Sequence, residues 1–270
     1  MKASLIISVY KNTKFLNVVL ESLKYQTEND FEIIISEDGE SEEMRDFIKS
    51  YRFRHLHTHL TQPDEGWRKN RALNRAILAA KAEQLIFIDG DCVLHPRFIE
   101  AHTYKFNPDV INAAKRVMLN DSLSQKLIDN PRIVTSLQPY MWLALIRPHG
   151  IKRIEEGTYF PSLHHIRKLE YLTGCNMSFS RKAIMAINGF DEDYTRPAYG
   201  EDTDLVWRFK MAGFKFRSLR NTAVQYHLSH PLSWTDQSEN MALGHEKAAR
   251  HEFVCKNGLS LHLPTENSAL

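Results

Sequence analysis

The chain has 270 residues, 43% of them hydrophobic and 25% charged, and 35 Lys and Arg against 33 Asp and Glu give a formal net charge of +2. This length can bury a sizeable core without disulfides or metals, and the composition is that of an ordinary globular protein. A net charge this close to zero gives no reason to expect nucleic acid as a partner.

The cysteines and the N-terminal residues indicate in which cellular compartment we expect the protein. Cys92, Cys175 and Cys255 show no paired metal spacing and leave an odd one out, which fits a reducing environment. Lys2 is followed by a short apolar run, not by the long apolar core of a signal peptide, and no run approaches the roughly 20 residues that span a bilayer. We therefore expect a cytoplasmic protein, either soluble or peripheral to the inner face of the membrane.

The first third of the chain alternates strand and helix patterns. Apolar or β-branched runs predict strands at residues 5–9, 31–35, 55–60 and 85–88. Helical spacing, with caps at Asn12 or Thr13 and at Ser41, predicts helices at residues 13–23, 41–48 and 67–80. This order implies right-handed crossovers and a mainly parallel central sheet flanked by helices, so the loops at the strand ends should gather around one crevice.

The middle of the chain is less regular. Helices are predicted at residues 96–104, 123–129 and 181–187, and strands at residues 110–115, 171–180 and 223–225. No periodicity is clear from Pro131 to Pro161. Within this stretch, the apolar run Tyr140–Ile146 is interpreted as a helix packed in a second lobe, with an acceptor-binding or membrane-touching flap as the alternative.

A last helix is predicted at residues 234–253. Its helical spacing runs through Met241, Ala242, His245 and Ala249, and its polar faces carry Glu239, Glu246, Lys247 and Arg250. Packing against the sheet is favoured over dimerisation or contact with a membrane. Residues after Lys256 are expected to form a loose tail or a short closing segment.

The most informative motif is the apolar run 85–88 that ends in Asp89-Gly90-Asp91. Because side chains alternate along a strand, Asp89 and Asp91 lie on one side, and Gly90 lets a ligand approach the backbone. Paired carboxylates at the carboxyl end of a buried strand suit a divalent cation that carries a phosphate. A plain Asp-Gly-Asp turn is the alternative.

A second acidic cluster and a histidine pair follow. Glu201, Asp202 and Asp204 open a predicted helix, where carboxylates can serve as caps, but three acids within four positions exceed what one cap needs. His227 and His230 follow a strand-like segment, and imidazole is a good ligand for transition metals. The alternating histidines His55, His57 and His59 are interpreted as exposed strand residues without an acidic partner.

The order of these motifs resembles glycosyltransferase family 2, inverting enzymes with the GT-A, Rossmann-like nucleotide-sugar-binding fold. The residues that carry the likeness are Ile7–Tyr10, Glu37–Gly39, Gly66–Arg68, Asn74–Ala76, Asp89–Asp91, Gly174–Asn176, Gly189–Asp191 and Gly200–Asp202. The later block, from Gly174 to His230, is more similar to the galactosyltransferase and chondroitin-polymerase branch. The resemblance implies a GT-A domain at 1–232, with a nucleotide-binding half at 1–104 and an acceptor and catalytic half at 105–232 that includes an irregular acceptor-side lobe. A C-terminal helix and tail at 233–270 would follow.

The resemblance also implies a UDP-sugar donor. It assigns nucleotide binding to Tyr10, Glu37, Asp38, Arg68, Lys69, Asn74, Asp89 and Gly90. Tyr10 would stack on the base, and Asp38, with Glu37, would accept the imino hydrogen of uracil. Arg68 and Lys69 would approach the pyrophosphate, and which of the two contacts it stays open.

For the cation, Mn²⁺ or Mg²⁺, the resemblance implies Asp91 as a direct ligand and Asp89 as a contact to ribose or to water in the coordination shell. His230 or His227 would complete the ligands, with His230 favoured. Asp202 would be the general base and Glu201 would hold acceptor hydroxyls, whereas Asp191 would be structural or acceptor-side.

The function implied is transfer of a hexose or N-acetylhexosamine from a UDP-sugar to a glycan or lipid-linked saccharide, with peripheral membrane contact possible and the oligomeric state open. One alternative is a non-catalytic nucleotide- or carbohydrate-binding module. Another is a sugar nucleotidyltransferase, although such enzymes use an early glycine-rich basic loop, which Tyr10–Thr13 is not.

Overall fold

The computed structural model describes residues 1–161, 167–231 and 236–263. A β-sheet flanked by helices forms its centre. The main sheet has the strand order β3-β2-β1-β4-β8-β6-β9. Its strands are β1 (Ala3–Val9), β2 (Phe31–Glu37), β3 (His57–Leu60), β4 (Gln84–Asp89), β6 (Val110–Ala113), β8 (Met177–Ser180) and β9 (Lys215–Ser218). Only β8 runs antiparallel to its neighbours within this sheet of the described residues, so the predicted mainly parallel α/β sheet is confirmed.

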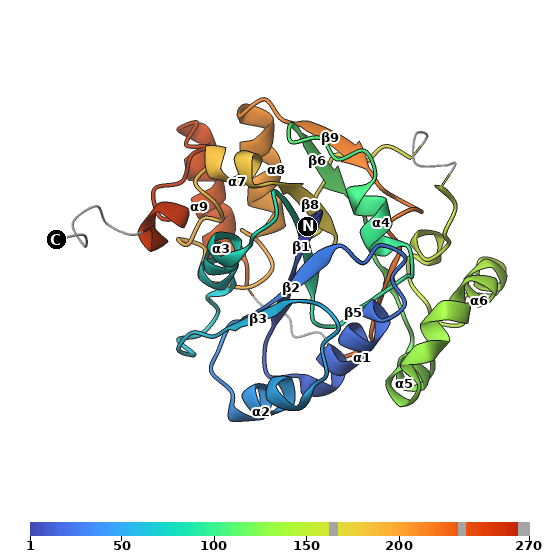
Figure 1. Cartoon of the computed structure of the whole chain (residues 1–270). Coiled ribbons are helices and arrows are strands. Elements are labelled where there is room, and N and C mark those ends of the chain that lie inside the picture. Colours follow the sequence, from blue (N-terminus) through green and yellow to red (C-terminus); the bar gives the residue numbers. More distant parts are fainter. Residues whose placement is uncertain (162–166, 232–235, 264–270) are drawn as a thin grey trace.

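Helices cover both faces of this sheet (Figure 1). One face packs on α1 (Thr13–Leu23), α2 (Glu42–Ser50) and α4 (Phe98–Thr103), and the other on α3 (Lys69–Ala79), α7 (Arg181–Ala186) and α8 (Asp202–Met211). Alternate residues of β1 explain the division, since Leu5 and Ile7 belong to the first apolar cluster and Ile6 belongs to the second. Asn12 and Ser41 cap the first two helices, as predicted.

A small second sheet lies beside the main one. It has the order β5-β10-β7 and consists of β5 (Cys92–Leu94), β10 (Gln225–His227) and β7 (Val117–Met118). Together with α1 it packs on α5 (Asp121–Asp129), the 3₁₀ segments η1 (Pro131–Ser136) and η2 (Ile154–Glu156), and α6 (Leu137–Ala144). The apolar run Tyr140–Ile146 is therefore largely helical, but only some of its side chains pack against the rest of the protein. Leu137, Met141 and Ala144 are buried, whereas Trp142 and Leu143 are exposed.

The strand predicted at 171–180 was wrong in its first part. Only Met177–Ser180 forms a strand, because Asn176 N–H donates to the Thr173 carbonyl at 2.7 Å and the chain turns at Gly174. None of the helices within the described ranges is long and apolar enough to cross a membrane.

The C-terminal helix α9 (Ser238–Ala249) does not pack through the apolar face predicted from Met241, Ala242, His245 and Ala249. It packs through the opposite face. Met241 is 42% exposed, whereas Asn240, Gly244 and Lys247 are buried. Polar contacts hold it, since the Asn240 amide donates to the carbonyls of Arg196 and Tyr199. The predicted helix start at Trp234 and the tail from residue 264 lie outside the described residues. Between them η4 (Leu259–His262) buries Leu259 in the core and forms the predicted closing segment.

Candidate active site

A cleft of about 770 Å³ opens at the carboxyl ends of β1, β2 and β4. These strands are neighbours in the sheet, so Val9 lies beside Glu37 and Ser8 lies beside Asp89. Residues of the 66–69 and 229–231 segments complete the wall. In an open parallel sheet this edge is where ligands bind, and the volume is that of a small-molecule site.

Tyr10 and Asp38 both line the cleft. The Tyr10 ring is 54% exposed, and its hydroxyl lies 3.2 Å from Asp64. The buried Asp38 carboxylate accepts hydrogen bonds from the Gln62 amide at 2.7 Å and the Arg68 backbone N–H at 2.8 Å. Asp38 therefore holds the loop that carries Lys69 into the cleft, and the exposed Tyr10 ring offers an aromatic face to a ligand.

Three residues expected to bind the nucleotide do not line the cleft of the described residues, because their side chains have partners elsewhere. Glu37 is 1% exposed and contacts His59 at 2.8 Å, so the interpretation of His59 as lacking an acidic partner was wrong. The Arg68 guanidinium donates to the Trp67 carbonyl. Asn74 is fully buried and exchanges hydrogen bonds with the backbone of Phe190.

Lys69 links the two halves of the site. Its ammonium lies 2.7 Å from Asp89 at the end of β4 and 2.9 Å from Glu201 at the start of α8. Burial opposes the charge, but these two carboxylates outweigh burial and hold the pKa of Lys69 above its usual value. A second cation, Arg116, lies 3.7 Å from Asp89. Sequence reasoning did not identify Arg116 as a site residue. Its position directly after the predicted strand at 110–115 was the signal that could have done so.

Glu201 is held in a tight space. A Cβ on Gly174 would lie 2.2 Å from Glu201 Oε1, so only glycine leaves room for this carboxylate. Burial raises the pKa of Glu201 to about 7, with Asp89 and Asp202 adding to the effect and Lys69 opposing it. The ionised form of Glu201 is therefore costly in the folded protein.

Asp91 meets two histidines on the other side of Gly90. His227 Nε2 lies 3.3 Å and His230 Nε2 lies 3.1 Å from Asp91 Oδ2. The second sheet brings them together, because β10 pairs with β5 and the Leu228 N–H donates to the Asp91 carbonyl at 2.9 Å. Gly90 itself packs against β1, where a Cβ would lie 2.7 Å from the Val9 side chain.

The donor set of Asp91, His227 and His230 fits a divalent cation. One ligand atom from each lies within 4.8 Å of the others, and His227 Nδ1 is buried without a hydrogen-bond partner among the described residues. Although burial opposes ionisation, the two imidazoles lower the pKa of Asp91. Two imidazoles with one carboxylate suit Mn²⁺ or another transition metal better than Mg²⁺, which prefers oxygen ligands. Asp89 is outside this set, because its carboxylate is directed to Lys69 and Arg116.

The acidic residues of α8 divide into two roles. Asp202 is partly exposed, and its Oδ2 accepts a hydrogen bond from the Gly174 N–H at 2.9 Å. Asp204 is 1% exposed and pairs with Arg208 at 2.8 Å, which gives it a structural role. Of the three acids that made this helix a candidate for function, only Glu201 and Asp202 therefore remain candidates.

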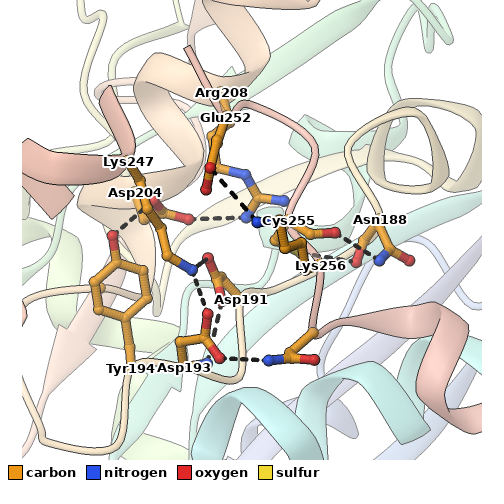
Figure 2. Close-up of polar contacts among 12 residues, drawn as sticks. Asn188, Asp191, Asp193, Tyr194, Asp204, Arg208, Lys247, Glu252, Cys255 and Lys256 are labelled. Carbon is orange, nitrogen blue, oxygen red and sulfur yellow. Dashed lines mark hydrogen bonds and ion pairs between the residues drawn. The ribbon is translucent and has the colours of Figure 1, made fainter. Parts of the chain in front are cut away.

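Asp191 lies in a buried ion-pair cluster that joins α9 to the loop before α8 (Figure 2). Lys247 contacts both Asp191 and Asp193. Burial raises the pKa of Asp191, although Lys247 opposes the rise. Asn70 donates to the carbonyls of Asp191, at 2.7 Å, and Gly200, at 3.1 Å. The cluster thus fixes the backbone next to Glu201, which agrees with the structural role expected for Asp191.

The fold is the GT-A fold of nucleotide-sugar-dependent glycosyltransferases. The N-terminal part, residues 1–349, of S. aureus TarS in complex with UDP-GlcNAc superposes with a TM-score of 0.60 at 15% identity, over 98% of this chain and 77% of that one. GalNAc-T7 with UDP, GalNAc and Mn²⁺ superposes with a TM-score of 0.61 at 14% identity, over 97% of this chain and 51% of that one.

The sequence of the chain is similar to glycosyltransferase family 2 over residues 4–128, and to the family described as the N-terminal domain of galactosyltransferase over residues 158–231. Chondroitin synthase of Escherichia coli is 26% identical over 84% of this chain, and validoxylamine A glucosyltransferase of Streptomyces hygroscopicus subsp. jinggangensis is 25% identical over 78%. The chain spans 35% of the first relative and 51% of the second.

Proposed function

We propose that this protein is an inverting, metal-dependent glycosyltransferase that moves a hexose or N-acetylhexosamine from a UDP-sugar to a saccharide or lipid-linked saccharide. The observation that carries the proposal is the convergence of two sets of groups from distant segments. Asp91 and His230, two of the three candidate cation ligands, line the cleft, and Lys69 in the same cleft wall contacts Glu201, which precedes Asp202. Solved relatives of the fold hold UDP-GlcNAc, or UDP and GalNAc with Mn²⁺, which supports this donor class.

The donor would lie along the cleft. Tyr10 would stack on the uracil ring and Asp38 would contact its edge, since both line the cleft and the Tyr10 ring lies beside Gly39, the residue after Asp38. The diphosphate would lie toward Asp91, with Lys69 adding positive charge from the cleft wall. A cation held by Asp91, His227 and His230 would neutralise the charge that develops on the departing nucleotide.

The acceptor would approach from the side of α8. Asp202 is partly exposed, and the Gly174 N–H donates a hydrogen bond to its carboxylate. We assign to Asp202 the removal of the proton from the acceptor hydroxyl while that oxygen bonds to the anomeric carbon. The bond from the anomeric carbon to the diphosphate breaks on the opposite face, so one displacement inverts the configuration. Glu201 would hold acceptor hydroxyls from its fixed place beside Lys69.

A thermal-shift screen of nucleoside diphosphate sugars, with Mn²⁺ or with chelator, tests the donor class. We expect a UDP-sugar with Mn²⁺ to raise the melting temperature most, and the same sugar with chelator to have a much smaller effect. Slow release of UDP from that sugar in water then separates an enzyme from a binding module. Stabilisation without UDP release, with or without saccharide acceptors, would favour the binding module.

A sugar nucleotidyltransferase is separated by its products. Such an enzyme would consume UTP and a sugar 1-phosphate and release pyrophosphate, whereas the proposed reaction releases UDP. Release of pyrophosphate by the wild-type chain, but not by Asp202→Asn, would overturn the proposal.

A further inference from the structure

The surface around α6 is apolar and exposed. It consists of α6 and the chain that follows it to Arg153, and we refer to it as the α6 surface. Figure 1 shows α6 at the outer edge of the molecule, on the side away from α9. The exposed fractions of its large side chains are 79% for Ile146, 61% for Leu143, 44% for Trp142 and 41% for Leu145. Soluble proteins rarely expose several large apolar side chains next to one another, so this group marks an interaction surface.

Helical spacing separates the buried and exposed faces of this segment. Leu137, Met141 and Ala144 recur at intervals of four and three and are buried against the second sheet and α5. Leu143 and Ile146 lie three apart on the exposed side, and the Ile146 N–H donates to the Leu143 carbonyl at 3.1 Å, which continues the helical turn past the end of α6. The exposed side chains therefore project together from one helical end.

The stretch of chain that carries this patch has only positive charges. Residues 131–153 contain Arg132, Arg147, Lys152 and Arg153 and no Asp or Glu, whereas Asp129 and Glu155 flank the stretch. All four cations are exposed, and none forms an ion pair with another described residue. Elsewhere on this protein many surface cations do pair, as Lys182 does with Asp109 at 2.7 Å.

We propose that the α6 surface docks on an anionic lipid membrane. Apolar side chains interspersed with Lys and Arg are the pattern of an interfacial segment, which inserts its apolar face at the level of the lipid headgroups and attracts anionic lipids electrostatically. Trp142 and Tyr140 suit that depth, because amphipathic rings concentrate at membrane interfaces.

The α6 surface is joined to the candidate cation site. The Gln138 amide of α6 donates to the Tyr226 hydroxyl at 2.8 Å, and Tyr226 precedes His227. The Ser229 N–H donates to Ser124 Oγ of α5 at 2.8 Å, and Ser229 precedes His230. Docking through α6 would bring the protein to the bilayer, where a lipid-linked saccharide lies. This last consequence rests on the proposed function, whereas the docking does not.

Sedimentation of the whole chain with lipid vesicles tests the proposal. We expect binding to vesicles of phosphatidylcholine mixed with phosphatidylglycerol and much weaker binding to phosphatidylcholine alone. The pair Lys152→Glu and Arg153→Glu should lower partitioning at least about 25-fold, since each basic residue near an anionic surface contributes about fivefold. The pair Leu143→Ser and Ile146→Ser should lower it at least about tenfold, through lost apolar burial.

Matched variants elsewhere on the surface control for charge and hydrophobicity. Lys49→Glu with Lys215→Glu changes the net charge equally on exposed residues, and Met185→Ser with Met211→Ser removes apolar side chains that are 43% and 49% exposed. Both controls should bind vesicles as the wild type does. Because every substituted residue is exposed, melting temperatures should stay unchanged.

Three outcomes would overturn the docking proposal. The first is failure of the wild type to bind the mixed vesicles, and the second is an equal loss of binding in the control variants. The third is a wild-type dimer in sedimentation velocity that Leu143→Ser with Ile146→Ser converts to monomers, since the patch would then be a protein interface. UDP release in the absence of vesicles should be the same in all these variants. Its absence from every one, the wild type included, would count against the proposed function and leave the docking result standing.

Discussion

Glu201→Gln should make the protein more stable above pH 7. The pKa of Glu201 rises from 4.5 to about 7 on folding, chiefly through burial. Between these values the folded protein keeps a proton that the unfolded chain has lost, so the free energy of unfolding falls as pH rises. The difference corresponds to about 3 kcal/mol. Glutamine resembles the protonated acid in shape and charge, so the variant avoids this loss.

Urea unfolding of the two proteins across this pH range measures the effect. We expect equal stability below pH 4.5, and a variant about 3 kcal/mol more stable than the wild type above pH 7. Glu239→Gln, at a glutamate whose side chain is 68% exposed, is the matched control and should leave the curve unchanged. A constant difference between wild type and Glu201→Gln at every pH would refute the reasoning, because it would mean that Lys69 fully compensates the burial of the carboxylate.

Four further substitutions test the site. Asp202→Asn should slow UDP release in the presence of acceptor by roughly 10²- to 10⁴-fold with donor affinity retained in calorimetry, and unchanged turnover would remove Asp202 from the mechanism. Asp91→Ala should abolish the tightening of donor binding by Mn²⁺, and calorimetry that finds equal affinities with metal and with chelator for the wild type would contradict the cation site. Gly174→Ala should displace the carboxylate of Glu201, since the new Cβ would lie 2.2 Å from it, and should lower turnover in the same assay; wild-type rates would argue against a role for that carboxylate. Lys247→Met leaves buried Asp191 without its partner and should lower the free energy of urea unfolding by about 3–5 kcal/mol, whereas a stability like that of the wild type would show that water reaches this carboxylate.

The N-terminal fold could be predicted because its signals are local. The run at 85–88 is apolar at every position and the run at 5–9 at every position except Ser8, as a strand covered on both faces requires, and Asn12 and Ser41 cap the helices they precede. The family could be recognised from motifs at the strand ends. Asp91, His227 and His230 were all expected at the cation, and the structure brings their side chains together.

The remaining features depend on contacts between distant segments. The buried face of α9 is polar because Asp191 and Asp193 meet Lys247 across more than 50 positions, and hydrophobic periodicity along α9 alone therefore indicated the wrong face. Glu37 could not be separated from Asp38 by sequence, since only the pairing of β2 with β3 brings His59 to it. Asn74 likewise meets Phe190 across 116 positions.

The shared position of Lys69 has a consequence for the order of events at the site. One ammonium balances a carboxylate from each half of the protein, so any new anion beside Asp89 must compete with Glu201 for the same positive charge. Arrival of a diphosphate would weaken the hold of Lys69 on Glu201 and make that acid harder to ionise. Under the proposed function, donor binding beside Asp89 and protonation of Glu201 would therefore be thermodynamically linked, and each would alter the other by the same free energy.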